Sequence, residues 1–386
     1  TERYRQLRDE GLPEGDILKS FKTPPKMTVY SWKGDIDTVM TPMDSIKYYK
    51  MILRNAMMSM EPSGPNAGYV RAWVGGIDFE HFKYDQVKMG TRQVGSTAKP
   101  FTYAVAINEG YSPCYTVENK PVTIDGWTPR AYNPKPGAIT LKTALASSQN
   151  YVTAYVMDQV GATAVSTMTK RLGITSDVAA LPSICLGSFD ASVYDMVGAY
   201  STFANQGVWT EPIYLLRIED KNGTVLYEKR PQVREVLNPQ VAYVMVDMLK
   251  GVVQHGTGVR LRYKYGLTNP IGGKTGTTQN NSDGWFIGIT PELVTGVWTG
   301  AEDRAIHFSS TNQGEGANSA LPVFALYMKK VYADKRLKYT KGDFETPPGG
   351  VSIALNCDAY APKTDSTTVQ QPAVQPAATP PATPPN

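Results

Sequence analysis

One short stretch organises the rest of this chain: Gly95-Ser96-Thr97-Ala98-Lys99-Pro100-Phe101. The apolar spacing after it predicts a helix over residues 97–109, and Pro100 is compatible with the first turn, where amide hydrogens lack intrahelical partners. Ser96 then lies at the helix N-terminus, where the helix dipole favours developing negative charge. Lys99 follows three positions later, on the same helical face as Ser96. A hydroxyl and an amine one turn apart can form a nucleophile and its base, provided that the amine is neutral near neutral pH.

That condition requires a large change in the pKa of Lys99. An unperturbed lysine has a pKa of ~10.4, whereas a general base works best with a pKa near ~7. The difference corresponds to ~4 kcal/mol against the ammonium form, which burial and a second nearby cation can supply. Lys274 is the candidate for that cation. Taken alone, Ser-x-x-Lys is also consistent with a helix-capping serine and a surface lysine, although Ser96 is the only serine with lysine three positions later.

The composition is that of an ordinary globular protein, with 386 residues, 41% of them hydrophobic and 19% charged. A net charge of +4 is too small to argue for nucleic-acid binding or for attachment to a membrane surface. No apolar run reaches the ~18 residues that a membrane span needs, and no signal peptide opens the sequence. Because the chain begins with Thr1, we expect a fragment or processed form of a longer protein.

The cysteines and histidines do not form a metal-binding pattern. Cys114, Cys185 and Cys357 are too widely spaced for a metal-type pair. One disulfide is possible, most simply Cys114–Cys185, and the odd number leaves at least one cysteine unpaired within the chain. The three histidines lie far apart and are better explained as structural or surface residues than as ligands. The residues therefore imply no metal and no organic cofactor.

The two ends of the chain differ from its centre. Residues 1–40 are polar and predict an irregular linker or N-terminal extension, with a possible short strand over 27–32. Beyond about residue 345 the chain becomes polar and then rich in Pro, Ala and Thr, which predicts a disordered tail over 345–386. Residues 41–344 remain as the catalytic domain.

Within that domain, strands are predicted at both ends and helices between them. The predicted helices cover residues 41–54, 140–160 with an interruption at 147–150, 199–204, 239–253 and 320–332. The predicted strands cover residues 56–60, 69–75, 271–278, 284–289 and 293–299, with an Asn-Gly hairpin over 214–228. This order indicates an α+β fold, in which a central antiparallel sheet of about five strands combines the first hairpin with the last three strands and is flanked by helices.

Two further short patterns can complete a site around Ser96. Ser148-Gln149-Asn150 interrupts a helical pair, so a hydroxyl and an amide two residues apart can pass a proton and bind a substrate amide. Helix capping is the simpler explanation of this pattern when it is taken alone. The stretch Ile271-Gly272-Gly273-Lys274-Thr275-Gly276-Thr277-Thr278 is more specific. Its lysine sets a positive field, its threonines point to one side at strand periodicity, and Gly276 lets a ligand approach the backbone.

Ser-x-x-Lys, Ser-x-Asn and Lys-Thr-Gly, in this order, form the motif set of β-lactamases and penicillin-binding proteins. The longer stretches around them, 92–101, 143–150 and 274–300, resemble the transpeptidase domain of a class A penicillin-binding protein, and the resemblance covers roughly residues 42–335. Gln149 stands where class A β-lactamases usually have Asp, which argues against a β-lactamase.

The resemblance implies a mechanism and a role for each motif residue. Ser96 would attack the penultimate D-alanine carbonyl of a peptidoglycan stem peptide, and Lys99 would take its proton. Ser148, beside Lys274, would return a proton to the departing D-alanine, and Asn150 would hold the substrate amide. The remaining roles fall on the strand: Thr275 and Thr277 would bind the terminal carboxylate next to Gly276, and the backbone N–H groups of Ser96 and Thr277 would form the oxyanion hole.

The implied activity is D,D-transpeptidation, in which an amine of a second stem peptide accepts the acyl group and β-lactams act as covalent inhibitors. Two alternatives stay open: a D,D-carboxypeptidase or β-lactamase that uses water as acceptor, and a penicillin-binding sensor without turnover. Transfer and hydrolysis differ only in acceptor access and water exclusion, which the sequence does not specify. The resemblance also implies a membrane-anchored, extracytoplasmic parent protein with an N-terminal glycosyltransferase domain, which this chain would follow.

Overall fold

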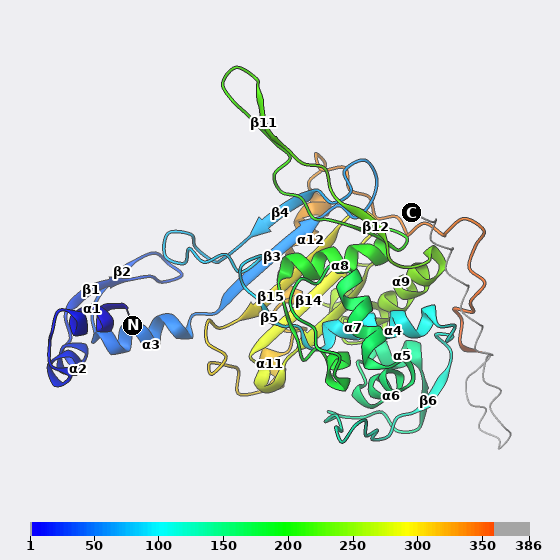
Figure 1. The fold of residues 1–386 in the computed structure, drawn as a ribbon, viewed down its shortest axis with the longest axis horizontal. Coiled ribbons are helices and arrows are strands. Elements are labelled where there is room, and N and C mark those ends of the chain that lie inside the picture. Colours follow the sequence, from blue (N-terminus) through cyan, green and yellow to red (C-terminus); the bar gives the residue numbers. More distant parts are fainter. Residues whose placement is uncertain (1, 359–386) are drawn as a thin grey trace, which may run out of the picture.

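A five-stranded antiparallel sheet forms the centre of the structure, a computed structural model in which residues 2–358 are described (Figure 1). The strand order is β13-β14-β15-β3-β4, so two strands from early in the chain pair with three from late in it. The bounds are Arg54–Met60 for β3, Val70–Val74 for β4, Gly272–Thr277 for β13, Asp283–Ile289 for β14 and Val294–Gly300 for β15. The predicted α+β fold, with its sheet built from the first hairpin and the last three strands, is confirmed.

Helices cover both faces of this sheet. On β14, Trp285 and Ile287 join the hydrophobic cluster formed with α4 (Lys99–Asn108), α8 (Val193–Ala204) and α9 (Pro239–Gln254). Phe286 lies between them in sequence and belongs to a second cluster, where its ring meets Phe324 of α12 (Leu321–Ala333) at 4.9 Å between centroids. Because successive strand side chains point to opposite faces, the sheet is the middle layer of three. This arrangement leaves β13 as an edge strand.

The other elements surround this core. The helices are α5 (Leu141–Ala146), α6 (Asn150–Val160), α7 (Ala162–Arg171), α10 (Arg260–Tyr263) and α11 (Thr311–Gly314), with 3-10 turns η1 (Gly95–Ala98), η2 (Pro182–Leu186) and η3 (Gln279–Asn281). Two short strand pairs are β5 (Arg92–Gln93) with β8 (Asp190–Ala191), and β6 (Thr116–Glu118) with β7 (Ala138–Thr140). Two more are β9 (Val208–Thr210) with β12 (Val233–Glu235), and β10 (Arg217–Glu219) with β11 (Val225–Glu228). The β10–β11 pair is the predicted Asn-Gly hairpin, and it projects from the body in Figure 1.

The N-terminal region is folded, so the prediction of an irregular extension over residues 1–40 is wrong. It contains α1 (Glu2–Asp9), α2 (Glu14–Lys22), the hairpin β1–β2 (Lys26–Val29 and Ile36–Val39) and then α3 (Pro42–Met51). Leu7, Ile17 and Phe21 form a small core of their own, against which Tyr4 and Ile46 pack. The helices are short and mostly polar, and their few apolar residues are buried only by one another. For this reason the amino-acid composition of residues 1–40 resembles that of a linker.

The C-terminal segment that precedes residue 359 is also ordered. Val351, Ile353 and Leu355 pack against the main core, and the backbone carbonyl of Leu355 accepts a 3.0 Å hydrogen bond from Lys142 Nζ. The prediction of disorder is therefore wrong for residues 345–358, and its remainder lies outside the described residues.

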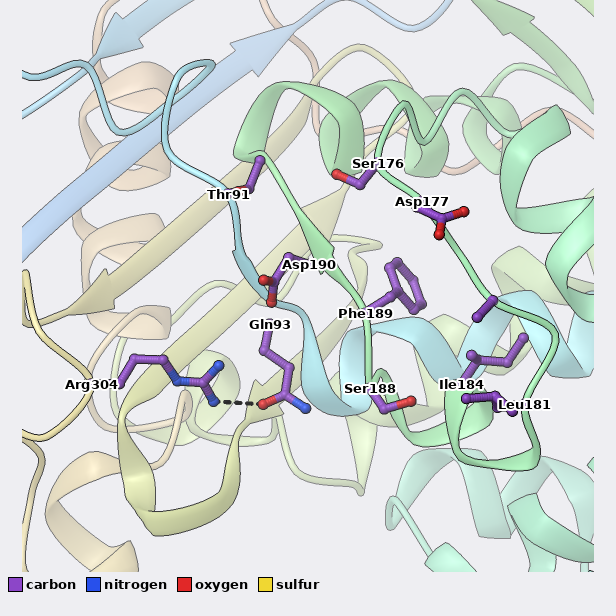
Figure 2. Close-up of a pocket in the computed structure, with 11 residues that line it drawn as sticks. Thr91, Gln93, Ser176, Asp177, Leu181, Ile184, Ser188, Phe189, Asp190 and Arg304 are labelled. Carbon is purple, nitrogen blue, oxygen red and sulfur yellow. Dashed lines mark hydrogen bonds between the residues drawn. The ribbon is translucent and has the colours of Figure 1, made fainter.

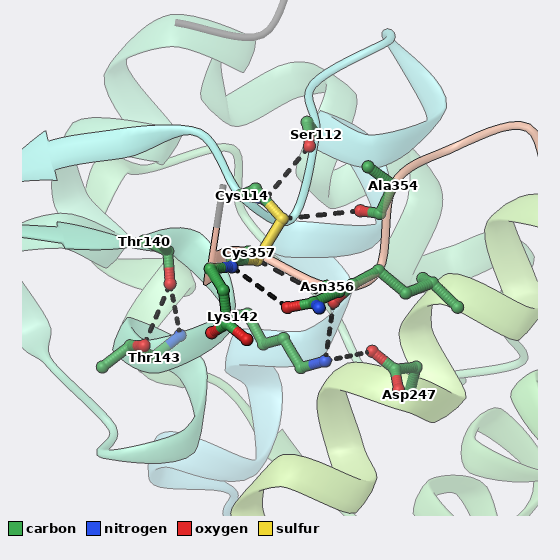
Figure 3. The surroundings of a disulfide bond; sticks show 11 residues. Ser112, Cys114, Thr140, Lys142, Thr143, Asp247, Ala354, Asn356 and Cys357 are labelled. Carbon is green, nitrogen blue, oxygen red and sulfur yellow. Dashed lines mark hydrogen bonds and ion pairs between the residues drawn. A yellow bond between two sulfur atoms is a disulfide. The ribbon is translucent and has the colours of Figure 1, made fainter. Parts of the chain in front are cut away.

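A disulfide joins this segment to the body, between Cys357 and Cys114 (Figure 3). The sequence left the pairing open, and Cys114–Cys185, its simplest possibility, does not form because Cys185 is a free, buried cysteine. Packing of the C-terminal segment on the core brings the Cα of Cys357 within 5.0 Å of that of Cys114. Burial raises the pKa of the Cys185 thiol to about 12, so this thiol is neutral at physiological pH.

None of the helices in residues 2–358 has the length and apolarity needed to cross a bilayer.

Candidate active site

Ser96 lies in the 3-10 turn η1, which leads directly into α4. The predicted helix is confirmed in position, but its first turn is 3-10, and the α-helix proper begins at Lys99. The turn is held from two sides: Gly95 N–H donates to the carbonyl of Gly187, and the buried hydroxyl of Tyr200 donates to the carbonyl of Thr97 at 2.7 Å. The Ser96 side chain is partly exposed. The turn is thus fixed, while the Ser96 side chain keeps some exposure to solvent.

Lys99 is fully buried, and its amine is surrounded by oxygen acceptors from the turn between α5 and α6. Its Nζ donates to the Ser148 carbonyl at 2.5 Å, to Ser148 Oγ at 3.1 Å and to Asn150 Oδ1 at 2.7 Å. Burial lowers the pKa of Lys99 to about 7, because the ammonium loses its hydration. The amine therefore meets the requirement for a general base at neutral pH.

Lys274 reaches the same hydroxyl from the other side. It is fully buried on β13, and its Nζ lies 2.9 Å from Ser148 Oγ and 3.0 Å from the Thr275 carbonyl. Burial first, and then the charge of Lys99, lower the pKa of Lys274 well below its usual value. Lys274 thus lies where the sequence analysis expected a second cation, but the pKa of Lys99 is lowered by burial rather than by the charge of Lys274. Since two adjacent buried ammonium groups are costly, a proton can move between the amines through the Ser148 hydroxyl.

The position of Ser148 depends on an unusual backbone conformation. Its φ is +57°, in the left-handed region that non-glycine residues rarely adopt. The residue lies between α5 and α6, where the predicted interruption of the helical pair is confirmed. Strained backbone of this kind persists where surrounding contacts hold it. Here those contacts are the hydrogen bonds from the two lysines to the carbonyl and hydroxyl of Ser148.

Strand β13 presents its free edge to the Ser96 turn. Thr278 N–H donates to the Asp283 carbonyl across the β13–β14 pair, and the alternation of antiparallel hydrogen bonds then directs the N–H and carbonyl of Thr277 away from β14. The Thr277 carbonyl lies so close to Gly95 that a Cβ there would approach it to 2.9 Å. At Gly276 a Cβ would meet Val94 O and Thr97 Cγ2, both at 2.9 Å. Gly276, which was expected to let a ligand approach the backbone, therefore allows the close approach of the Ser96 turn.

The threonines of β13 have protein partners. The Thr275 hydroxyl shares a 2.6 Å hydrogen bond with the hydroxyl of Thr257, and Thr277 Oγ1 accepts from Gly316 N at 3.1 Å. Thr257 was not predicted as a site residue. Its signal in the sequence is a hydroxyl between two glycines, Gly256-Thr257-Gly258, directly after α9. A Cβ at Gly256 would lie 2.1 Å from the Ala146 carbonyl, so this glycine allows the chain to reach the site.

The Ser-x-Asn segment also anchors the loop between β6 and β7. Asn150 uses Oδ1 for Lys99 and donates from Nδ2 to the Arg130 carbonyl at 2.6 Å. Gln149 Oε1 accepts from Asn119 Nδ2 at 2.8 Å and from Lys135 N at 3.1 Å. The sequence analysis gave Gln149 no role in the site. In the structure its side chain holds the loop between β6 and β7 through hydrogen bonds with Asn119 and Lys135. Residues 119–137 therefore lie beside the candidate site.

The contacts bring the predicted site residues together: Lys99 and Lys274 both reach the Ser148 hydroxyl, Asn150 accepts from Lys99, and the Ser96 turn lies against Gly276 and Thr277 of β13. Among residues 2–358, no group of three or more His, Cys, Asp or Glu side chains is arranged to hold a metal ion.

Comparison with known proteins agrees with this geometry. The family model for the penicillin-binding protein transpeptidase domain matches residues 57–304, and that for the penicillin-binding protein middle domain matches residues 1–53. Penicillin-binding protein 1A of Aquifex aeolicus is 33% identical over 296 residues, which cover 75% of this chain and 39% of that protein. Penicillin-binding protein 1B of Vibrio cholerae is 35% identical over 308 residues, covering 76% and 39%. The chain thus spans about two fifths of the length of these relatives.

Solved structures share the fold. Penicillin-binding protein 1A from Haemophilus influenzae superposes with a TM-score of 0.67 at 24% identity, covering 77% of this chain and 49% of that one. Penicillin-binding protein PonA1 from Mycobacterium tuberculosis gives a TM-score of 0.65 at 24% identity, covering 83% and 86%. The resemblance first drawn from three short motifs is confirmed over most of the chain. The chain belongs to the penicillin-binding protein transpeptidase family.

Proposed function

We propose that this chain is the D,D-transpeptidase part of a longer enzyme and cross-links peptidoglycan stem peptides through an acyl-enzyme on Ser96. The observation that carries the proposal is the pair of buried lysines that share the Ser148 hydroxyl beside the Ser96 turn. Buried amines with lowered pKa values are what a serine nucleophile needs at neutral pH.

In the acylation step, Ser96 Oγ attacks the carbonyl of the penultimate D-alanine and its proton passes to the neutral amine of Lys99. The oxyanion is held by the backbone N–H groups of Ser96 and Thr277, an interaction worth ~3–4 kcal/mol per donor. The outward direction of the Thr277 N–H on the β13 edge supports this role. The C–N bond then breaks, and the leaving amine takes a proton from Ser148, which Lys274 and Lys99 replenish.

In the second step, an amine of another stem peptide attacks the acyl-enzyme and Ser96 regains its proton. Thr275 and Thr277 bind the terminal carboxylate of the donor, and Gly276 allows this strand to lie against the Ser96 turn. Asn150 holds the donor amide, for which it must exchange its present partner, the Arg130 carbonyl. β-Lactams acylate the same serine and are the expected covalent inhibitors.

The parent protein is proposed to be membrane-anchored, with this chain on the extracytoplasmic side after a glycosyltransferase domain. The support is family membership and the two fifths of each relative that the chain spans.

Labelling with a fluorescent penicillin tests the acylation site. Wild-type protein should be labelled on Ser96, and Ser96→Ala should lose labelling while keeping the circular dichroism spectrum of the folded chain. Persistent labelling at another residue would refute the assignment. Release of D-alanine from a donor peptide should then increase when an amine acceptor is added, whereas equal release in water alone indicates a hydrolase. An acyl-enzyme that forms without any release indicates a sensor.

A further inference from the structure

The segment that leads into the Ser96 turn is held in place by other parts of the chain. Gly95 N–H donates to the Gly187 carbonyl. Gln93 Oε1 accepts from Arg304 at 2.6 Å, at the wall of a pocket of about 540 Å³ that both residues line (Figure 2). This side of the candidate site is therefore fixed by hydrogen bonds from two separate segments.

The loop between β6 and β7, on the side of Asn150, is attached only at its base and near its tip. At the base, Asn119 Nδ2 donates to the Lys135 carbonyl at 2.6 Å and to Gln149 Oε1 at 2.8 Å. Near the tip, Ile124 and Trp127 exchange both of their backbone hydrogen bonds, and both side chains pack against the main core. The stretch between these two attachments is free of secondary structure.

Residues 130–134, which we call the flap, lie in that stretch, and all of them except Ala131 are exposed. Within residues 2–358, one hydrogen bond joins the flap to the rest of the protein. It runs from Asn150 Nδ2 to the Arg130 carbonyl, at 2.6 Å. The position of the flap over the site therefore depends on a single side chain, which belongs to the candidate site itself.

This hydrogen bond uses the group that the proposed mechanism assigns to the donor. Asn150 Oδ1 accepts from Lys99 Nζ at 2.7 Å, which fixes the orientation of the amide and turns Nδ2 toward the flap. The Arg130 carbonyl then accepts from Nδ2, as the carbonyl of a donor amide would. A backbone carbonyl of the chain thus stands where the donor amide is expected.

We propose that the flap closes the donor site, and that an acyl donor opens it by replacing the Arg130 carbonyl at Asn150 with its own amide carbonyl. The inference rests on the proposed function, which gives the donor amide to Asn150. A donor with an amide carbonyl exchanges one hydrogen bond for another, so opening costs it little. A donor without that carbonyl leaves the flap closed. The flap thereby selects acyl donors that carry an amide next to the reacting group.

Trypsin can report the state of the flap. Arg130 is followed by Ala131, whereas the two lysines of the loop, Lys120 and Lys135, are each followed by proline, which trypsin does not cut. Cleavage after Arg130 requires the flap to leave the body, so its rate follows the population of the open flap. Mass spectrometry measures this rate for the free chain and for two acylated forms.

The two acylating compounds differ only at the group in question. Benzylpenicillin carries an acylamino side chain with an amide carbonyl, and aminopenicillanic acid has the same rings with a free amine instead. Benzylpenicillin should raise the rate of cleavage after Arg130 roughly fivefold, which is the effect of one hydrogen bond, and aminopenicillanic acid should change it less than about twofold. Cleavage after Arg336, an exposed arginine beyond α12, is the internal reference and should not change.

Asn119→Ala provides a second measurement, because it removes both hydrogen bonds at the base of the loop. In the free chain, cleavage after Arg130 should become roughly fivefold faster. Acylation by benzylpenicillin should accelerate by a similar factor, and acylation by aminopenicillanic acid should not. Asn222→Ala, at an exposed position between β10 and β11, is the matched control and should behave as wild type. If Asn119→Ala does not fold, the comparison of the two compounds on the wild-type chain still decides.

The outcomes separate the flap from the proposed function. If benzylpenicillin labels Ser96 but cleavage after Arg130 stays at the rate of the free chain, the flap is refuted and the proposed function stands. Equal acceleration by both compounds also refutes the exchange at Asn150. If neither compound labels Ser96, the proposed function itself fails, and the exchange fails with it.

Discussion

Lys99 and Lys274 reach one hydroxyl oxygen, that of Ser148, from opposite sides at 3.1 and 2.9 Å. Both amines are fully buried, and each hydrogen-bonds a backbone carbonyl as well. Because two neighbouring ammonium groups cannot both be stabilised in such a site, their protonation is coupled and the pair titrates as a unit. Burial lowers the pKa of both amines, that of Lys99 to about 7.

The rate of acylation should rise with pH through this range. Since burial lowers the pKa of Lys99 to about 7, the neutral amine increases roughly tenfold between pH 6 and pH 8. The second-order rate constant for fluorescent penicillin, measured from pH 5.5 to 8.5, should follow that fraction. A rate that does not change over this interval would remove Lys99 from the role of base.

The same group makes stability depend on pH, with a sign that can be checked. The pKa of Lys99 is about 7 in the folded chain and near the ordinary lysine value of 10.5 in the unfolded chain, so the unfolded state binds more protons between these two values. The free energy of unfolding should therefore increase with pH across this window, and urea denaturation at pH 7 and pH 9 measures it. Lys99→Met should reduce the dependence, leaving the part that Lys274 contributes, whereas Lys330→Met, on an exposed position of α12, should leave it unchanged.

Lys99→Met should nearly abolish acylation, because the variant keeps the length of the side chain but has no base. The expected loss in the rate of penicillin labelling is roughly 10²–10⁴-fold, with a cooperative thermal transition retained. Lys330→Met again serves as the control that removes one lysine without touching the site. Near wild-type acylation in the Lys99 variant would shift the base role to Ser148.

Thr257→Val should weaken the binding of donor peptides while leaving the chemistry intact. The change removes the 2.6 Å hydrogen bond to Thr275, so the Thr275 hydroxyl loses the partner that orients it toward a carboxylate. A hydrogen bond worth ~1 kcal/mol corresponds to a roughly fivefold higher KM with kcat unchanged. Thr257→Ser restores the hydroxyl and should restore KM; a variant in which kcat alone falls would contradict the role in binding.

Cys357→Ser should destabilise the chain, because the disulfide closes a loop across a sequence separation of 243 residues. The expected decrease in the free energy of unfolding is ~2–4 kcal/mol. Wild-type protein treated with reductant should lose the same amount, and the variant should not respond to reductant. Cys185→Ala leaves the disulfide in place and should keep the response; its loss there would contradict the pairing.

The sequence alone determined the parts of this protein whose signals are local. The spacing of Ser96 and Lys99 is one helical turn, and β14 is a short apolar run bounded by turn residues, so both could be read from a few neighbouring residues. The strand with Lys274 was likewise recognised from a few consecutive residues, 271–278, with their glycines and threonines. The convergence of these segments was predicted from the order of the motifs, which resembles that of a known family.

Only the tertiary structure decided the features that depend on contacts between distant segments. The disulfide partner of Cys114 is Cys357 because Val351, Ile353 and Leu355 find apolar surface on the core, and no local pattern encodes that packing. The hydrogen bond between Thr257 and Thr275 exists because Gly256 lets α9 end against the Ala146 carbonyl. The same holds for the lowered pKa of Lys99: its cause is burial, and burial is a property of the assembled fold rather than of the residues next to it in sequence.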